Sequence, residues 1–490
     1  MGSNDAETKH FYLIRYEDDE AALPLFDEAG LRAGPHISIV IGRNGSGKSR
    51  FLARVADELT FLAQSHRPSE RRRSMAPPTE RASLVYRFDG LLCEIIREGR
   101  GITCFVERVP MKFDEAPFPA RVAVVAHLPT DRFRYSENQA DDFYRYLGLR
   151  QATNLTTTGA LESKVLESLI LGFQDDTFSS RMAGWLALAG FSADLSLEIS
   201  VRTPELIFGG PEHFRELAEK AVTARLGPVR SASFIRRPEW DFDISKLELF
   251  FSSLRTAAWK DHGRRFVVMI DLIEIVNSQR DLESWRAGLF LSRRFRLLEG
   301  ASLILRKAGI PIPFSDLSSG EQQIIGMNAR LLAEIAPYSL VIIDEPEISL
   351  HPEWQMRYVP TLENALRPFK TVHALIATHS HFMVSDIESQ TATLVVASSG
   401  DHAQFDFFEG DVYGRSPENI LYRVFGVAAT GNVNVERDLH DALSMLSGAM
   451  PLQRKRLVDI RERLIRVCGP DNVVLREIVD ELSSALEASE

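Results

Sequence analysis

Apolar and polar positions at the start of the chain follow the order strand, loop and helix. An apolar run at residues 37–41 is typical of a buried strand, and residues 51–59 then place apolar side chains at helical spacing. Residues 83–109 alternate apolar and polar positions between glycines, which is the pattern of antiparallel strands. A second apolar run at residues 122–126 predicts a further buried strand. The first 135 residues therefore predict strands and a helix with a β-rich lobe attached.

The middle of the chain changes to mainly helical spacing. Apolar stripes run through residues 161–173 and 214–222, and one strand-like alternation interrupts them at residues 195–201. No heptad pattern is sustained, so we expect no long coiled-coil arm. Residues 301–400 return to alternating strands and helices.

The end of the chain predicts amphipathic helices. Their apolar faces consist of Leu457, Ile460, Leu464 and Val467 in one helix, and of Leu475, Ile478, Leu482 and Leu486 in the next. The first of these helices also has a basic flank, made of Arg454, Lys455, Arg456, Arg461, Arg463 and Arg466. We interpret this flank as an ordinary solvated face, with contact to nucleic acid or to an acidic partner as the alternative.

Composition excludes several classes of protein. The chain has 490 residues, 44% hydrophobic and 26% charged, which is globular and neither collagen-like nor wholly disordered. Its 57 basic and 68 acidic residues leave a net charge of -11, which argues against nucleic-acid binding through bulk positive charge. Three cysteines without regular spacing encode neither a disulfide framework nor a zinc site. Without a secretory pattern or a bilayer-spanning apolar run, we expect a soluble cytoplasmic protein with no membrane part.

A glycine-rich segment between the first predicted strand and helix fits the phosphate-binding pattern GxxxxGK[ST]. Its candidate nucleotide-binding residues are Gly42, Asn44, Gly45, Ser46, Gly47, Lys48 and Ser49. The glycines allow a tight turn whose backbone N–H groups point at phosphate oxygens, and the following helix adds its positive N-terminal end. Lys48 is expected to reach the β- and γ-phosphates, and the Ser49 hydroxyl to bind Mg²⁺.

Two adjacent acids follow a buried strand almost 300 residues later. The apolar run 340–343 ends in Asp344 and Glu345, and two carboxylates in such a place are costly unless they bind a cation or act on water. Asp344 suits the shell of Mg²⁺, and Glu345 suits the general base that aligns the attacking water.

Two further segments complete a set of four motifs. Ser318 and Gly320, in the sequence LSSGE, begin a predicted helix, and such a start binds anions. One ATP cannot easily use both helix starts of one protomer. Downstream, the predicted strand 374–377 ends at His379, which we interpret as a sensor of the γ-phosphate.

These four elements in this order resemble the ABC-type ATPases. The segment 344–355, DEPEISLHPEWQ, is similar more narrowly to SMC/RecF-like heads, OLD proteins and the ATPase subunits of anti-phage systems such as Septu and PARIS. The resemblance covers residues 10–135 and 300–400. It implies an α/β fold, namely a P-loop ABC-type ATPase head with an antiparallel β lobe, a mainly helical insertion and a helical C-terminal tail.

The resemblance also implies that two heads sandwich ATP and Mg²⁺ between them. Lys48 and Ser49 then take the P-loop roles, Asp344 the magnesium role, Glu345 the role of the base and His379 that of the switch. A homodimer, or a higher homo-oligomer, of ATPase heads is the implied assembly.

The signature segment would act across that dimer. Ser318 and Gly320 are implied to contact the partner's nucleotide, and Ser349 occupies the D-loop position. The sequence departs from the family at Ser319, where transporters commonly have glycine, and at His381, where OLD-like sequences frequently have proline. Neither change removes a catalytic group, and no Q-loop glutamine can be placed.

These motifs divide the chain into four expected parts. Residues 1–135 are the N-terminal half of the head with the P-loop and β lobe, and residues 136–300 are the insertion. Residues 301–410 are the C-terminal half with the signature, the acidic strand and the switch histidine. Residues 411–490 are a helical region expected to dock a partner.

Three functions from different classes compete. In the favoured one, the chain hydrolyses ATP as the sensor and scaffold for a separate effector, expected to be a nuclease, in anti-phage defence, with DNA or a phage protein as the trigger. The alternative is a DNA-repair or chromosome-associated clamp gated by ATP. The lack of a membrane segment argues against transport. No nuclease motif is apparent: Glu409 and Asp411 resemble a fragment of a TOPRIM site but are interpreted as a loop.

Overall fold

The chain forms two compact units, residues 1–414 and 415–490. The computed structural model describes residues 10–28, 35–66, 75–135, 143–150, 158–263, 265–279, 281–385, 387, 392–399, 403–408, 433–446, 453–467, 479, 482, 483 and 486. The candidate loop acids Glu409 and Asp411 lie outside these residues, as do Leu475 and Ile478. Within the described residues, no helix is long and apolar enough to cross a membrane.

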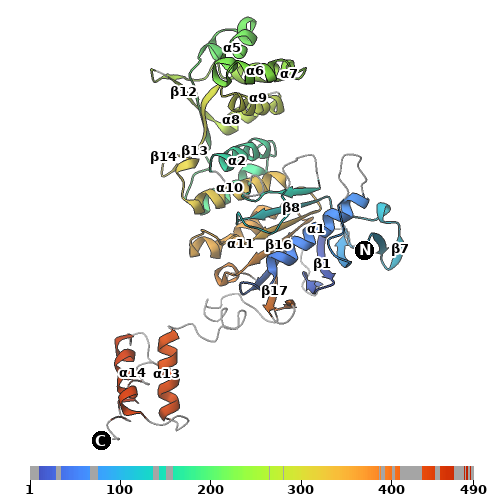
Figure 1. Cartoon of the computed structure of the whole chain (residues 1–490), viewed down its shortest axis with the longest axis vertical. Helices are drawn as coiled ribbons and strands as arrows, with labels where there is room; N and C mark the ends of the chain where they lie inside the picture. Colours follow the sequence, from blue (N-terminus) through green and yellow to red (C-terminus); the bar gives the residue numbers. More distant parts are fainter. Residues whose placement is uncertain are drawn as a thin grey trace, which may run out of the picture. The chain divides into compact units, whose positions relative to one another are not determined.

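A seven-stranded sheet forms the core of the first unit (Figure 1). Its strands, in spatial order, are β18(Ala403–Phe407), β17(Ala392–Ser399), β3(His36–Gly42), β16(Val372–Thr378), β15(Ser339–Asp344), β8(Arg121–Ala126) and β9(Tyr144–Tyr146). All neighbours are parallel except β18 and β17. Every residue of β3, β15 and β16 is buried, which explains why the sequence shows continuous apolar runs there instead of alternation.

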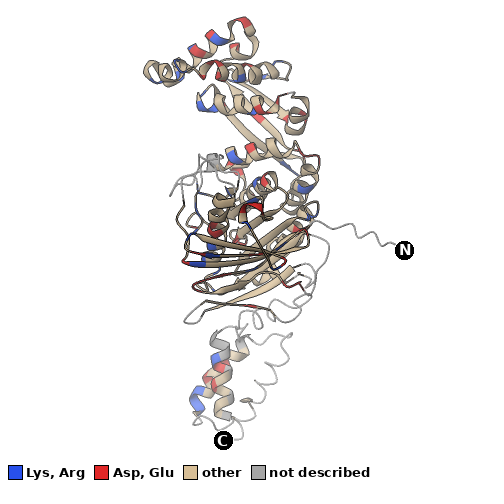
Figure 2. Cartoon of the chain, turned by 90° about the vertical axis from the view of Figure 1, so that its right-hand side faces the viewer, with Lys and Arg blue, Asp and Glu red and all other residues tan. Residues whose placement is uncertain are grey.

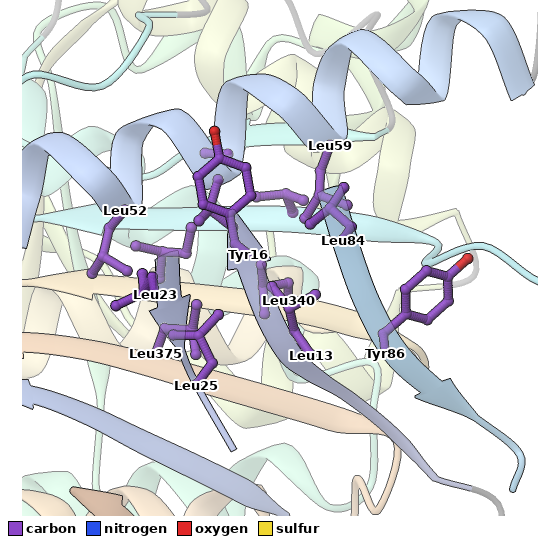
Figure 3. Packing of buried hydrophobic residues seen from close by; sticks show 14 of the residues in the cluster. Leu13, Tyr16, Leu23, Leu25, Leu52, Leu59, Leu84, Tyr86, Leu340 and Leu375 are labelled. Atoms are coloured by element: carbon purple, nitrogen blue, oxygen red, sulfur yellow. The ribbon is translucent and has the colours of Figure 1, made fainter. Parts of the chain in front are cut away.

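An antiparallel lobe covers one side of the first helix. Its order is β2(Ala22–Pro24), β1(Phe11–Asp18), β4(Arg81–Phe88), β5(Leu91–Glu98), β6(Gly101–Val106) and β7(Val109–Met111). The long helix α1(Lys48–His66) shares one hydrophobic core with this lobe and with the central sheet. Figure 3 shows Leu52 and Leu59 of α1 beside Tyr16 and Leu84 of the lobe, with Leu340 of the sheet close by. The helix that begins at the P-loop is therefore packed firmly against both sheets.

The insertion contains a sheet that the sequence did not reveal as a whole. The strand predicted at residues 195–201 is β10, and it lies at the centre of a five-stranded antiparallel sheet. The spatial order is β11(Lys260–Asp261), β12(Phe266–Asp271), β10(Ser196–Val201), β13(Leu298–Lys307) and β14(Ile310–Pro313). The predicted boundary between residues 300 and 301 falls within β13. The pairing escaped prediction because β10 meets partners about 70 and 100 residues away, and β11 has only two residues.

Helices make up most of the rest of the insertion, as predicted. They are α2(Thr158–Gly172), α3(Phe178–Leu188), α4(Glu205–Phe208), α5(Phe214–Leu226), α6(Pro228–Ile235), α7(Trp240–Ser253), α8(Leu272–Ser278) and α9(Leu282–Arg294). Short 3-10 turns lie at η2(Phe113–Glu115), η3(Pro211–His213), η4(Phe314–Asp316) and η5(His381–Val384). Helices α2 and α3 pack on α10(Ser319–Glu334), and α3 also contacts α11(Pro352–Leu366) (Figure 1). The first helices of the insertion thus support the helix that Ser318 caps.

The second unit contains α13(Val433–Leu446) and α14(Arg454–Val467). The predicted apolar face is confirmed at Leu457, Ile460 and Leu464, which are buried against residues of α13. Part of the basic flank of α14 is neutralised, because Arg456 pairs with Asp441 at 2.5 Å and Arg463 with Asp438 at 2.7 Å. Basic and acidic residues are mixed along the described helices of this unit (Figure 2). These contacts favour an ordinary mixed-charge face.

Candidate nucleotide-binding site

The P-loop lies between β3, which ends at Gly42, and α1, which begins at Lys48. Gly45 and Gly47 have φ angles of 83° and 92°, a region that side chains disfavour, so glycine is required for this turn. Lys48 is buried, and its ammonium donates hydrogen bonds to the carbonyl oxygens of Gly42 at 2.8 Å and Arg43 at 3.1 Å. The loop therefore encloses its own lysine. Asn44 is exposed at the rim of the loop.

Three carboxylates act on this lysine through space. Burial lowers the pKa of Lys48, while the charges of Glu345, Glu347 and Asp344 oppose that effect. The strand ends explain this proximity: in the register of the parallel strands, Ile41 lies opposite Thr378, and Asp344 lies opposite Ala377. Because the carboxyl ends of parallel strands share one edge of the sheet, the P-loop and the acids meet there.

Asp344 has the environment of a cation ligand. Burial raises its pKa to about 7, and a hydrogen bond with Ser49 partly offsets the rise. Its Oδ1 atom is buried and has no hydrogen-bond partner among the described residues. An orphaned carboxylate oxygen beside the Ser49 hydroxyl fits Mg²⁺, which typically takes one or two protein carboxylates and completes its shell with phosphate and water. The described residues contain no cluster of three or more acids, histidines or cysteines that could hold a metal without the nucleotide.

Glu345 and His379 face each other across two strand ends. The N–H of Glu345 donates to the carbonyl oxygen of Ala377 at 2.8 Å, which ties the residue to β16, and its φ is 50°. The Nδ1 atom of His379 lies 3.7 Å from Oε1 of Glu345. This interaction lowers the pKa of Glu345 and raises that of His379. Glu345 is therefore an ionised carboxylate at neutral pH, as a general base must be.

Two residues that the sequence analysis did not assign also belong to the site. Glu347 is buried and accepts hydrogen bonds from Thr378 and His379. His127 follows β8, and its N–H donates to the carbonyl oxygen of Asp344 at 3.3 Å. Burial lowers the pKa of His127 to about 4. The available signals were the second acid of the DEPE segment and the position of His127 directly after a predicted buried strand.

The signature segment forms a second group of residues. Ser318 is the N-cap of α10, and its side chain forms a capping box with Glu321. Lys307 of β13 holds the same Glu321 at 2.8 Å, so the insertion sheet reaches the signature directly. A Cβ atom on Gly320 would lie 2.4 Å from the carbonyl oxygen of Ser349, so only glycine allows this approach. Ser349 is exposed and has φ 64°. Its carbonyl oxygen lies beside Gly320 in the first turn of α10.

Comparison with known families agrees with this arrangement. Residues 210–385 match the family described as "AAA domain, putative AbiEii toxin, Type IV TA system". The matched segment includes Ser318 and Gly320, the strand β15 with Asp344, and His379. The chain has an α/β fold with a P-loop between β3 and α1. The resemblance based on the four motifs is confirmed, and so is the predicted fold class.

Two curated relatives of this chain are retron proteins. It is 33% identical to "Retron Ec83 probable ATPase" of Escherichia coli over 208 residues, 37% of each chain. It is 31% identical to "Retron Vc95 probable ATPase" of Vibrio cholerae serotype O1 biovar El Tor over 100 residues, 18% of this chain and 19% of that one. The matches span well under half of the relatives' length.

Solved structures similar to this chain include SMC heads. The SMC head domain from Thermotoga maritima is 12% identical, with a TM-score of 0.32 over 82% of this chain and 100% of that one. The Smc head with an extended coiled coil bound to the C-terminal domain of ScpA, from Pyrococcus furiosus, is 13% identical, with a TM-score of 0.31 over 81% and 96% of the two chains.

Binding of magnesium nucleotide is expected to depend on pH near 7. The folded pKa of Asp344, about 7, lies above its ordinary value of 3.8. Its contribution to the free energy of unfolding is therefore fully present below pH 4 and is lost as the pH rises through 7. Since a cation needs the ionised form, ATP with Mg²⁺ should raise the melting temperature more at pH 8 than at pH 6. EDTA should remove this difference.

The matched control for this pH dependence is Asp344→Asn. This variant has no titrating group at the position, so the melting-temperature response to ATP and Mg²⁺ should change less between pH 6 and pH 8 than it does in the unsubstituted protein. An equal response of the unsubstituted protein at both pH values would contradict the assignment of Asp344 to the cation.

Proposed function

We propose that the chain binds ATP with Mg²⁺ and hydrolyses it to ADP and phosphate. The observation that carries this proposal is the cluster at one edge of the central sheet, where Lys48, Ser49, Asp344, Glu345 and His379 come together. Mg²⁺, held by Ser49 and Asp344, would neutralise phosphate charge. Lys48 would bind phosphate oxygens in place of the two carbonyls it now contacts.

Glu345 takes the proton in the proposed reaction. A water molecule attacks the γ-phosphorus, the bond from that phosphorus to the bridging oxygen breaks, and the proton of the water passes to the Glu345 carboxylate. The raised pKa of His379 favours its protonated form, which donates a hydrogen bond to the charge developing on the γ-phosphate.

We further propose that two heads close around the nucleotides. In one protomer, Ser318 caps the helix that contains Gly320, and Gly320 lies against Ser349, so these residues form a group of their own. The exposed start of α10 is an anion-binding helix end. A second copy would bring this group to the γ-phosphate held by the first, so that each head completes the other's site.

We propose anti-phage defence as the biological setting. The printed names of the relatives, a retron ATPase in each case, and of the matched family, a toxin of a type IV system, support this proposal. The chain would act as a sensor and scaffold for a separate effector protein, a nuclease, with DNA or a phage protein as the trigger. The second unit, with α13 and α14, would dock that effector.

Lys48→Ala is the variant that tests the proposed function. Removing the buried ammonium should weaken ATP binding about 100-fold, because a charged group that contacts phosphate is lost. Titration calorimetry with ATP and Mg²⁺ measures the affinity, and light scattering measures whether ATP converts monomer to dimer. A phage plating assay measures protection in cells that carry the gene for this chain together with the genes that lie next to it.

Lys112→Ala is the matched control, since Lys112 is exposed in a surface ion pair with Glu115. It should bind ATP, dimerise and protect like the unsubstituted protein. Lys48→Ala that still bound ATP normally would contradict the nucleotide site. If the unsubstituted protein bound ATP but its molar mass in light scattering did not change, the proposed dimer would be contradicted.

A further inference from the structure

Glu347 is a buried acid to which the proposed reaction assigns no role. One of its oxygens, Oε1, accepts hydrogen bonds from the hydroxyl of Thr378 at 2.7 Å and from the N–H of His379 at 2.7 Å. The same oxygen lies 3.1 Å from Nδ1 of His379. Its other oxygen is buried and has no hydrogen-bond partner among the described residues. Burial raises the pKa of Glu347, and the donors from the end of β16 offset this effect only in part.

These contacts decide which ring nitrogen of His379 carries a proton. Nδ1 lies 3.1 Å from Glu347 and 3.7 Å from Glu345, so both neighbours of this nitrogen are hydrogen-bond acceptors. Nδ1 must therefore carry a proton, and Nε2 is the nitrogen left for another partner. Glu347 makes the shorter contact and also holds the backbone of His379, so it is better placed than Glu345 to orient the ring.

The same residue is connected to the turn that carries Ser349. The carbonyl oxygen of Glu347 accepts from the N–H of Leu350 at 3.0 Å and from Nε2 of Gln355 at 3.3 Å. Gln355 in turn accepts from the hydroxyl of Ser380 at 2.6 Å. Two side chains, those of Glu347 and Gln355, therefore link the turn after β15 to the turn after β16.

We propose that Glu347 is a positioning residue that keeps a proton on Nδ1 of His379, so that the doubly protonated ring donates from Nε2, and that it couples this histidine to the turn that carries Ser349. The inference rests on the proposed ATP hydrolysis for its kinetic consequence, but its structural part concerns the protein without nucleotide. Contact between Ser349 and a partner head would then change the position of the His379 ring.

The structural part is tested by nitrogen NMR on the full chain labelled with ¹⁵N-histidine. The signals of His379 are identified by their loss in His379→Gln. At pH 8.5 without nucleotide, the neutral ring should be protonated on Nδ1. In Glu347→Gln a larger share of the Nε2-protonated tautomer should appear, because a neutral amide oxygen is a weaker acceptor for the Nδ1 proton than a carboxylate. A ring protonated only on Nε2 in the unsubstituted protein overturns the proposal, whether or not the chain hydrolyses ATP.

The kinetic part uses the same variant. Glutamine has the shape of glutamate and can still accept from Thr378 and from the N–H of His379, so Glu347→Gln should bind ATP within about twofold of normal, whereas kcat should fall about 10- to 100-fold. Glu353→Gln, an exposed acid in the first turn of α11, is the matched control and should change neither.

The outcomes separate a positioning role from a structural one. A loss of kcat together with the tautomer change supports the proposal. An unchanged kcat overturns it, and so does a loss of kcat accompanied by a lower melting temperature and an unchanged tautomer. If the unsubstituted chain shows no ATP hydrolysis, the proposed function fails, while the tautomer measurement still decides the role of Glu347.

Discussion

Glu345→Gln is expected to abolish ATP turnover and leave ATP bound. The substitution keeps the shape of the side chain but removes the carboxylate that would take the proton from water. General-base catalysis typically contributes about 100- to 10,000-fold to a rate, so kcat should fall within that range. Because Lys48, Ser49 and Asp344 are unchanged, ATP affinity should be retained, and the closed dimer should accumulate.

Single-turnover hydrolysis of radiolabelled ATP measures this effect, and light scattering measures the dimer. Glu115→Gln, an exposed acid of the β lobe, is the matched control and should turn over ATP normally. A Glu345→Gln protein that hydrolysed ATP at the normal rate would show that another group is the base.

Arg97→Met is expected to lower the free energy of unfolding by about 3–5 kcal/mol. The side chains of Arg97 and Glu58 are both fully buried, and they form two parallel contacts, Nε to Oε1 at 2.6 Å and Nη2 to Oε2 at 2.8 Å. Arg97 also donates to the carbonyl oxygens of Thr79 and Gly99. The pair connects α1 with β5 of the lobe, so its loss leaves a carboxylate buried without a partner between them.

Urea unfolding measures the loss, and two further variants assign it. In the double variant Glu58→Leu with Arg97→Met, no unpaired charge remains, so at least half of the lost free energy should return. Arg81→Met removes the exposed partner of Glu98 and should cost no more than about 1 kcal/mol. Equal losses in Arg81→Met and Arg97→Met would contradict the role given to the buried pair.

Much of the nucleotide site could be predicted because its signals are local. The P-loop needs a strand, a glycine turn and a helix within a short segment, and residues 36–66 contain all three. Asp344 and His379 were found because each stands at the end of a buried strand whose apolar run is continuous. Parallel strands in the middle of a sheet have both faces covered, so their sequence is apolar throughout and easily recognised.

The remaining features depend on pairs of residues that are far apart in the chain. Glu347 contacts Thr378 and His379 only because β15 and β16 are neighbours in register, and the turn after β15 contains no local sign of these partners. The sequence has no local sign that Arg97 and Glu58 are buried, since an alternating strand and an amphipathic helix each tolerate charges on an exposed face. Their burial follows from the packing of α1 against the lobe.

The pattern of residues was sufficient for the α/β class, the P-loop, the two acids after β15 and the cap at Ser318, because each depends on backbone conformation and burial within one element. The tertiary structure was needed for the five-stranded sheet of the insertion, the approach of Gly320 to Ser349 and the contact between Glu347 and His379. Each of these contacts joins segments brought together by the packing of separate elements, and hydrophobic burial, which drives that packing, is non-directional and leaves no local record of which polar side chains will meet.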